Sequence, residues 1–330
     1  MCGKYSSEMP RLVSAELVEP VVRGLLGSVD VDGGPTDEQL RVLESITTHL
    51  WQRPDLDLRS LSPLGPDETA KRVDDPGARR RFSEVMFAIE MCRHPLSESQ
   101  VARCEAYSQA LGASPEEVVV FRELVDEGLA RAAADFDRFF AANVPGRAEV
   151  RFRELTHEPP RADPALVEQV ERYHELGEET LGWHLADFYS THGFTVPGSE
   201  ISPNTYFYFA HDMIHVISGI APTGIGEVAL GGFQMAMDDN PASTFAFFSP
   251  LVIHEAGFAG IDDIVAADFT LDRPYAAELL GKEMERGART TADFAWVDHL
   301  ELATRPLEEV RSRFGVVAPE SPNDGHHIYW

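Results

Sequence analysis

Two histidines and two acidic residues stand at a spacing that suits a metal ion. The chain reads His211-Asp212-x-x-His215, and Glu227 follows after eleven further residues. On a helix, residues four apart share a face, so His211 and His215 would present both imidazoles to one side. Imidazole and carboxylate groups bind divalent transition metals and, in sites of this kind, leave positions for water or substrate. The pattern therefore predicts a catalytic metal site more than a closed structural one.

The surrounding sequence predicts a helix hairpin that positions these groups. An aromatic run at residues 206–209 precedes the motif and indicates a buried helix. Residues 218–226 are rich in Gly and Pro, which predicts a helix end and a turn, so Glu227 would lie in the first turn of the next helix. Buried ionisable groups are costly unless their charge is compensated, and a metal would compensate it. The alternative is a helix core whose histidines are only hydrogen-bonded.

The acidic composition argues against some classes of partner. The chain of 330 residues has 28 Lys and Arg against 55 Asp and Glu, which gives a formal net charge of −27. So negative a field repels nucleic acid and anionic lipid headgroups. We therefore expect no nucleic-acid partner.

The termini and the cysteines indicate the compartment. The N-terminus lacks the basic and apolar regions of a signal peptide, and no apolar run is long enough to span a bilayer. Cys2, Cys92 and Cys104 are an odd number without metal-ligand spacing, which suggests buried or inert thiols in a reducing compartment. We expect a cytoplasmic protein that touches a membrane only peripherally, through an apolar surface.

Helical periodicity dominates the chain and predicts an all-α fold. Amphipathic helices are expected at residues 12–26, 38–50, 78–92, 97–111 and 115–140. Thr36, Ser97 and Ser114 supply helix starts, and Gly112 a helix end. The only alternating run, a weak one, spans residues 148–155, and residues 51–76 are expected to form a loop.

In the first half, residues 24–38 and 86–98 each pair an apolar helix end with a capped helix, and the first carries an acidic turn. With these two segments the chain resembles the TerB-like (tellurite-resistance) helical domain over roughly residues 10–140. The resemblance implies metal binding by such turns, for which only Asp30 and Asp32 remain here. Their spacing does not fit an EF-hand, and an ordinary Asp-Gly turn is the favoured interpretation. We predict a TerB-like domain at residues 1–145.

In the second half, Thr180-Leu181-Gly182 opens a helix, and the H-D-x-x-H and Glu227 pattern follows it. These residues resemble the "TLG" helix and the metal motif of the coenzyme Q biosynthesis protein 4 family, and the resemblance covers roughly residues 166–316. Residues 296–316 are similar to its closing segment. We predict a domain of this family at residues 146–330, a helical bundle with a metal-site hairpin.

The resemblance implies a role in ubiquinone biosynthesis, in which a prenylated aromatic substrate loses its ring carboxylate oxidatively, a lyase-type step. It implies His211, Asp212, His215 and Glu227 as the metal site. Zinc is the expected metal, with iron, manganese and cobalt as alternatives. Asp212 is also the candidate catalytic residue, as a base that orients His211 or moves a proton. The implied partners are an isoprenoid molecule, other enzymes of quinone biosynthesis, and further copies of the chain in a homo-oligomer.

Flexible and flat apolar side chains gather around the motif in the sequence. They suit a long isoprenoid chain, as in the tunnel that the resemblance implies, and they equally suit an ordinary helical core. The residues are Tyr206, Phe207, Tyr208, Phe209, Met213, Ile214, Phe233, Met235, Met237, Phe245, Phe247, Phe248 and Phe258.

Two other functions remain open. The motif is similar to the H-E-x-x-H of zinc proteases with Asp212 in the base position, which would indicate a metal-dependent hydrolase. His254-Glu255 lacks the second histidine of that pattern. The other alternative is a non-catalytic isoprenoid-binding scaffold with a structural metal. His326 and His327 in the tail could bind metal adventitiously.

Overall fold

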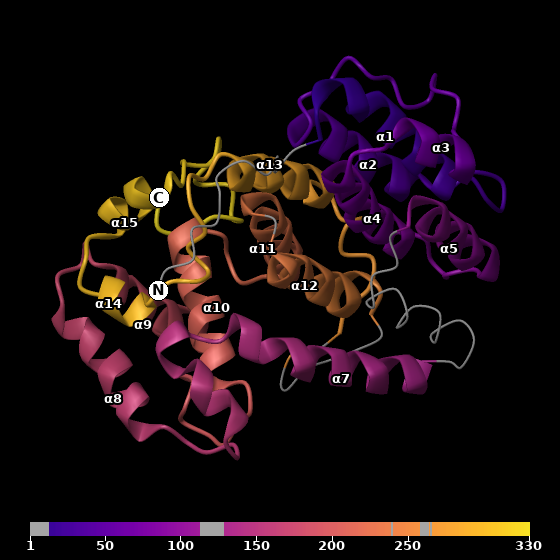
Figure 1. Cartoon of the computed structure of the whole chain (residues 1–330). Coiled ribbons are helices and arrows are strands. Elements are labelled where there is room, and N and C mark those ends of the chain that lie inside the picture. Colours follow the sequence, from indigo (N-terminus) through magenta and orange to yellow (C-terminus); the bar gives the residue numbers. More distant parts are fainter. Residues whose placement is uncertain (1–12, 113–128, 239, 258–263, 265) are drawn as a thin grey trace. The chain divides into compact units, whose positions relative to one another are not determined.

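The fold is all-α, as the sequence predicts. A computed structural model describes residues 13–112, 129–238, 240–257, 264 and 266–330 (Figure 1). Within these ranges the chain is mostly helical, and the only β-type pairings are isolated bridges. None of the helices there is both long and apolar enough to cross a membrane.

Two compact units make up the described chain. One comprises the described parts of Met1–Phe139 with Gly231–Ala288, and the other comprises Phe140–Leu230 with Arg289–Trp330. Helices α7 (Leu129–Arg147) and α11 (Gly224–Met237) each contain a point at which the chain passes from one unit to the other.

Among its described residues, the first unit contains eight further helical elements: α1 (Ala15–Ser28), α2 (Asp37–His49), α3 (Pro66–Arg72), α4 (Pro76–Met91), α5 (Glu98–Leu111), α12 (Pro241–Pro250), the π-helix η3 (Leu251–Glu255) and α13 (Ala276–Ala288). The second unit contains seven: the 3-10 helices η1 (Val150–His157) and η2 (Arg172–Glu175), and the α-helices α8 (Pro164–Glu171), α9 (Leu181–His192), α10 (Thr205–Ser218), α14 (His299–Leu302) and α15 (Leu307–Phe314).

The predicted helix starts and stops are confirmed where the structure describes them. Thr36 caps α2 by accepting from the backbone N–H of Gln39, whose side chain returns a bond to the Thr36 N–H. Ser97 caps α5 by accepting from the Gln100 N–H, without a return bond from the Gln100 side chain. Gly112 ends α5 in the left-handed region at φ 67°. Ser114 and the first half of the helix expected at residues 115–140 lie outside the described residues.

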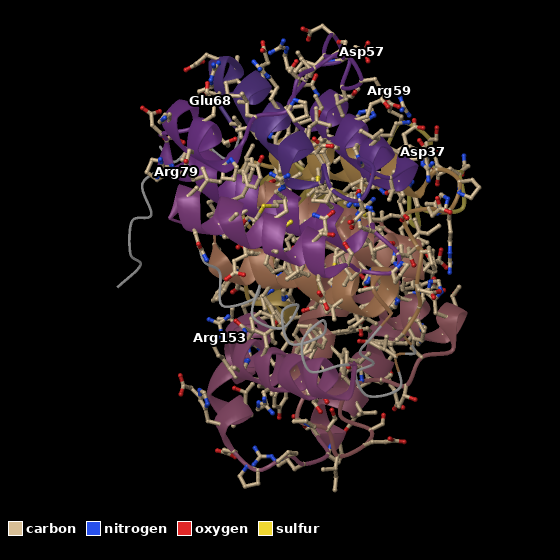
Figure 2. The ribbon with its side chains drawn as sticks, turned by 90° about the vertical axis from the view of Figure 1, so that its right-hand side faces the viewer. Asp37, Asp57, Arg59, Glu68, Arg79 and Arg153 are labelled. Atoms are coloured by element: carbon tan, nitrogen blue, oxygen red, sulfur yellow. The ribbon has the colours of Figure 1, made fainter. Side chains whose placement is uncertain are left out.

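The weak alternating run at residues 148–155 falls mostly in η1, a 3-10 helix, in keeping with the all-α prediction. One local prediction is wrong. The loop expected at residues 51–76 contains the short helix α3, which begins with Pro66 after Gly65. Arg79 (Figure 2) donates to the carbonyls of Ala70 and Val73 at the end of α3, so a residue from α4 satisfies acceptors that a short helix leaves open.

The two compact units are not separated by a single boundary at residue 145. Gly231–Ala288 belongs with the N-terminal unit. Helix packing is the physical reason. α13 lies against α2, and Gly281 allows the close approach, since a Cβ there would meet the Ser45 backbone carbonyl at 2.8 Å. The family assignments of residues 1–145 and 146–330 stay predictions.

In the second unit a buried arginine fixes the end of α10. Arg311 of α15 donates to the carbonyls of Val216 and Ile217 at 3.2 and 3.1 Å, and to that of Tyr329 at 2.7 Å. Its guanidinium also lies 3.6 Å from the centre of the Trp330 ring, a cation–π contact. The carbonyls at the end of α10 have no partner within their own helix, and Arg311 satisfies them.

We expect Arg311→Ala to lower the free energy of unfolding by about 3 kcal/mol, because it leaves buried carbonyls without a donor. Urea denaturation of the full chain measures this change. Arg313→Ala on the exposed side of the same helix is the matched control and should change stability by about 0.5 kcal/mol or less. Equal losses for the two variants would contradict the role given to Arg311.

Candidate metal centre

Helix α10 carries both predicted histidines, and the turn after it returns the chain to them. α10 ends at Gly219, which adopts the left-handed region at φ 69°, and α11 begins five residues later. A Cβ at position 219 would lie 1.9 Å from the Trp330 indole nitrogen, so only glycine fits there. Glu227 lies in the first turn of α11, as the sequence predicts.

Three of the four predicted ligands converge. The Nε2 atoms of His211 and His215 are 3.1 Å apart. Glu227 places Oε2 3.2 Å from His211 Nε2 and Oε1 3.1 Å from His215 Nε2. The His215 side chain is buried, whereas those of His211 and Glu227 are 25% and 20% exposed. The cluster is therefore closed on the His215 side and accessible to a small ligand on the other.

A backbone contact decides which nitrogen of His215 can act as a ligand. Its Nδ1 lies 2.9 Å from the Ile220 carbonyl, which can only accept, so Nδ1 carries the proton and donates. Nε2 is then left with a lone pair directed at the cluster. This arrangement of a metal-binding histidine with its second nitrogen bonded to a carbonyl is common in metal sites. The residues present fit a divalent cation with two nitrogen donors and one or two oxygen donors.

The charges of the three groups depend on one another. Burial raises the pKa of Glu227, but the adjacent His215 and His211 outweigh burial and hold that pKa well below its usual range. Burial lowers the pKa of His215, and Glu227 more than reverses this, so the net shift is upward. Glu227 is thus an ionised carboxylate, and either a proton on an imidazole or a divalent cation can balance its charge.

Asp212 lies beside this cluster without belonging to it. Among the described residues, the group whose ligand atoms lie within 4.8 Å of one another contains His211, His215 and Glu227. Asp212 Oδ2 instead accepts a 2.8 Å hydrogen bond from the Tyr189 hydroxyl. Burial raises the pKa of Asp212 to about 6, against the opposing effects of His211 and Tyr189. Its roles as ligand and catalytic residue stay predictions.

Helix α9 supplies contacts that the motif alone does not reveal. Besides Tyr189, α9 carries Phe188, whose ring stacks on the His215 imidazole with centroids 5.8 Å apart. On α10 itself, Phe207 stacks on His211 at the same centroid distance. The i, i+4 spacing of Phe207 and His211 could have predicted the second contact, but nothing in the sequence pairs α9 with α10.

The three segments that carry the sequence resemblance lie together in the second unit: the TLG helix start, the H-D-x-x-H motif and the closing segment at residues 296–316. The N–H groups of Leu181 and Gly182 donate to the carbonyls of Arg305 and Ala303, both at 2.8 Å. A Cβ on Gly182 would lie 2.9 Å from the Ala303 carbonyl, which explains the glycine. The closing segment therefore anchors α9, and α9 in turn contacts the cluster through Tyr189 and Phe188.

The apolar residues around the motif in the sequence lie mostly in the cores of their units. Phe209 and Met213 are fully buried in the second unit, and Phe233, Phe245 and Met237 are buried in the first. Phe258 lies outside the described residues. An isoprenoid tunnel stays a prediction.

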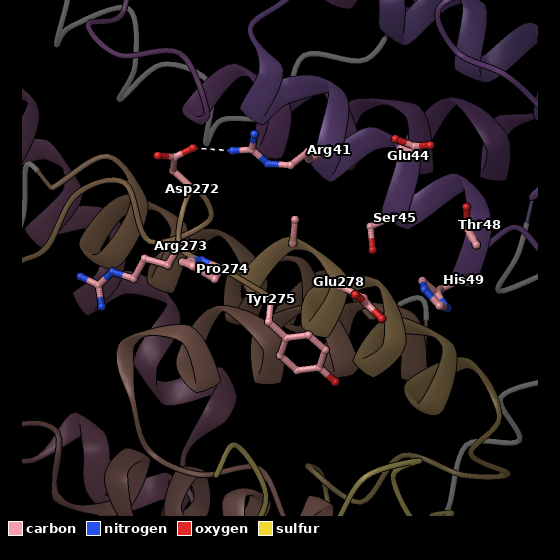
Figure 3. Close-up of a pocket in the computed structure, with 11 residues that line it drawn as sticks. Arg41, Glu44, Ser45, Thr48, His49, Asp272, Arg273, Pro274, Tyr275 and Glu278 are labelled. Carbon is pink, nitrogen blue, oxygen red and sulfur yellow. Dashed lines mark hydrogen bonds and ion pairs between the residues drawn. The ribbon is translucent and has the colours of Figure 1, made fainter. Parts of the chain in front are cut away.

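One pocket of about 560 Å³ opens in the first unit between α2 and the segment before α13 (Figure 3). Its lining is strongly charged: Arg41 pairs with Asp272, and Glu44, Arg273 and Glu278 lie around them. None of the four predicted site residues lines it. A lining of this kind does not suit an apolar chain.

Comparisons with known proteins give little further information. No protein-family model and no curated protein matches the chain. Three chains of solved structures match it. One, from Nostoc punctiforme, is described as a ubiquinone biosynthesis protein; it shares 16% identity, with 74% of this chain and 99% of that chain covered and a TM-score of 0.33. This similarity assigns neither a family nor a residue role.

The separate positions of Asp212 and Glu227 lead to a test. In a background with all three cysteines replaced by serine, we expect Glu227→Gln to weaken zinc binding by about 100-fold or more, as loss of a ligand does. Asp212→Asn should weaken zinc binding by only about 10-fold, as expected for a residue that orients a ligand without binding the metal itself. Competition with a fluorescent chelator measures both. Equal losses would instead make Asp212 a ligand.

Proposed function

We propose that the chain binds one divalent metal through His211, His215 and Glu227 and uses this centre on a prenylated aromatic acid of quinone biosynthesis. The observation that carries the proposal is the convergence of the three groups at 3.1–3.2 Å, with His215 Nε2 directed inward by the bond from its Nδ1. The sequence resemblance supplies the substrate class, and the net charge of −27 argues against nucleic acid as an alternative substrate.

The proposed reaction is oxidative removal of the ring carboxylate. For a ring with a hydroxyl opposite the carboxylate, one dioxygen balances the reaction: the carboxylate leaves as carbon dioxide, the ring becomes a quinone, and the remaining oxygen and two hydrogens form water. When bound, a metal would act as a Lewis acid that binds a substrate oxygen and stabilises negative charge on it.

The chain's own residues would position the substrate and move protons. His211 and Glu227 lie on the accessible side of the cluster, and the stacked Phe207 holds the His211 ring in place. The Tyr189 hydroxyl fixes Asp212 through Oδ2, so a proton can be exchanged at Oδ1. With a pKa of about 6, Asp212 can both accept and release a proton near neutral pH.

We expect His211→Ala/His215→Ala protein to lose the metal ion of this centre and at least about 100-fold of its turnover, since a Lewis acid contributes several kcal/mol. Metal analysis and organic extraction with mass spectrometry are applied to tag-free protein, followed by assay with a prenylated hydroxybenzoate under dioxygen. His157→Ala/His174→Ala, two exposed histidines of the same unit, is the matched control and should keep both properties.

Three outcomes would contradict the proposal in different ways. If the double variant kept the metal content and the turnover of the wild type, His211 and His215 would not be ligands of a catalytic metal. An isoprenoid that co-purifies with the wild type but is never converted would favour a scaffold. Peptidase activity that a chelator abolishes would favour a hydrolase.

A further inference from the structure

A second group of potential metal ligands is buried in the first unit. Glu38 lies in the first turn of α2, Cys92 directly follows α4, and Glu255 is the last residue of the π-helix η3. One ligand atom from each lies within 4.8 Å of the other two. The residues are 7%, 1% and 0% exposed. Three segments far apart in the sequence thus place two carboxyls and a thiol around one point, away from solvent.

One oxygen of the buried Glu38 carboxyl has no hydrogen-bond partner among the described residues, and the Glu255 carboxyl lies beside this group. That oxygen is Glu38 Oε1, and Glu38 Oε2 lies 3.9 Å from His94 Nε2, beyond hydrogen-bond distance. Buried polar atoms are nearly always bonded to protein or water, and a buried carboxylate without a partner is costly. The carboxyl of Glu38 therefore requires a ligand or a proton.

Glu255 is held in a fixed orientation and keeps lone pairs for a cation. Its Oε1 accepts from His94 Nε2–H at 2.7 Å, and its Oε2 accepts from the Leu271 backbone N–H at 2.6 Å. Each carboxylate oxygen can accept more than one bond, so both can also bind a cation. His94 is therefore a positioning residue for Glu255. Single π-helical turns such as η3 occur frequently at functional sites.

Cys92 faces this pair of acids in the form of a thiol. Its Sγ donates to the Ala88 carbonyl at 3.2 Å. Burial, followed by the nearby Glu255 and Glu38, raises the pKa of this thiol well above its usual range. A thiol in such surroundings is unreactive by itself, and a bound transition metal would deprotonate it.

A shared proton is the competing explanation for the two carboxyls. Burial and the adjacent Glu255 raise the pKa of Glu38 to about 9, so Glu38 could carry a proton at pH 7 and share it with the Glu255 carboxyl. That state still leaves Glu38 Oε1 without a hydrogen-bond partner in the part of the chain that the structure describes. A cation bound by all three groups satisfies each of them.

We propose that Glu38, Cys92 and Glu255 form a second divalent-metal site, selective for ions that accept both sulfur and oxygen, such as zinc or cobalt. Binding would release the Cys92 proton, and that of Glu38 where it is present, to solvent. The metal would then link the start of α2, the end of α4 and η3, so its role is structural. This site is independent of the proposed catalytic centre, which contains no sulfur ligand.

Sulfur ligation provides a test that separates the two sites. Cobalt(II) titrated into the full chain should produce a thiolate-to-cobalt charge-transfer band, and the metal content should approach two ions per chain. Cys92→Ser should remove the band and one ion. Cys104→Ser, also buried in the first unit, is the matched control and should keep both. His211→Ala/His215→Ala should lose the other ion and keep the band.

A second measurement needs no variant. X-ray absorption at the zinc edge of the wild type should show a sulfur neighbour at about 2.3 Å, on average about one sulfur for every two zinc ions when both sites are filled. Absence of a sulfur neighbour, together with no charge-transfer band, would overturn the proposal. A band that persists in folded Cys92→Ser protein would also overturn it, because the sulfur would then come from another residue. A Glu38→Gln variant that melts at a higher temperature and binds as much metal as the wild type would favour the shared proton.

Discussion

The turn that ends α10 is the constraint on which the candidate metal centre depends. Its left-handed residue, Gly219, cannot be replaced without a collision with the Trp330 ring, and the carbonyl of the next residue, Ile220, sets the protonated nitrogen of His215. The same turn fixes where α11 begins and hence where Glu227 lies. Arg311 holds the last turn of α10 from outside. A short segment therefore sets both the geometry and the tautomer of the site.

Both units bury ionisable side chains, and different groups compensate their charge in each. In the second unit two imidazoles stabilise Glu227 as a carboxylate, whereas burial makes the neighbouring Asp212 a weaker acid. In the first unit Glu38 and Glu255 face each other with a thiol beside them. A buried cluster of charged groups is costly without a cation. A cation that binds there therefore stabilises the fold strongly.

Local chemistry explains which helices could be predicted. Periodicity placed α1, α2, α4 and α5 to within a few residues, and the caps at Thr36 and Ser97 act through bonds to residues three positions away. The weak alternating run at residues 148–155 did not indicate a strand, because alternation over so few residues also fits a 3-10 turn. Short α3 was missed because its open carbonyls are satisfied by Arg79, from another helix.

The sequence by itself determined the spacing of His211 and His215 and the first-turn position of Glu227, since both follow from helix periodicity and turn composition. Only the tertiary structure decided that Tyr189 would donate a hydrogen bond to Asp212, which lies beside the other three groups. It alone brought Cys92 to the two buried carboxyls, and it alone grouped Gly231–Ala288 with the N-terminal unit. These contacts join segments that are distant in the chain, and no local pattern encodes which distant side chain will fill a given space.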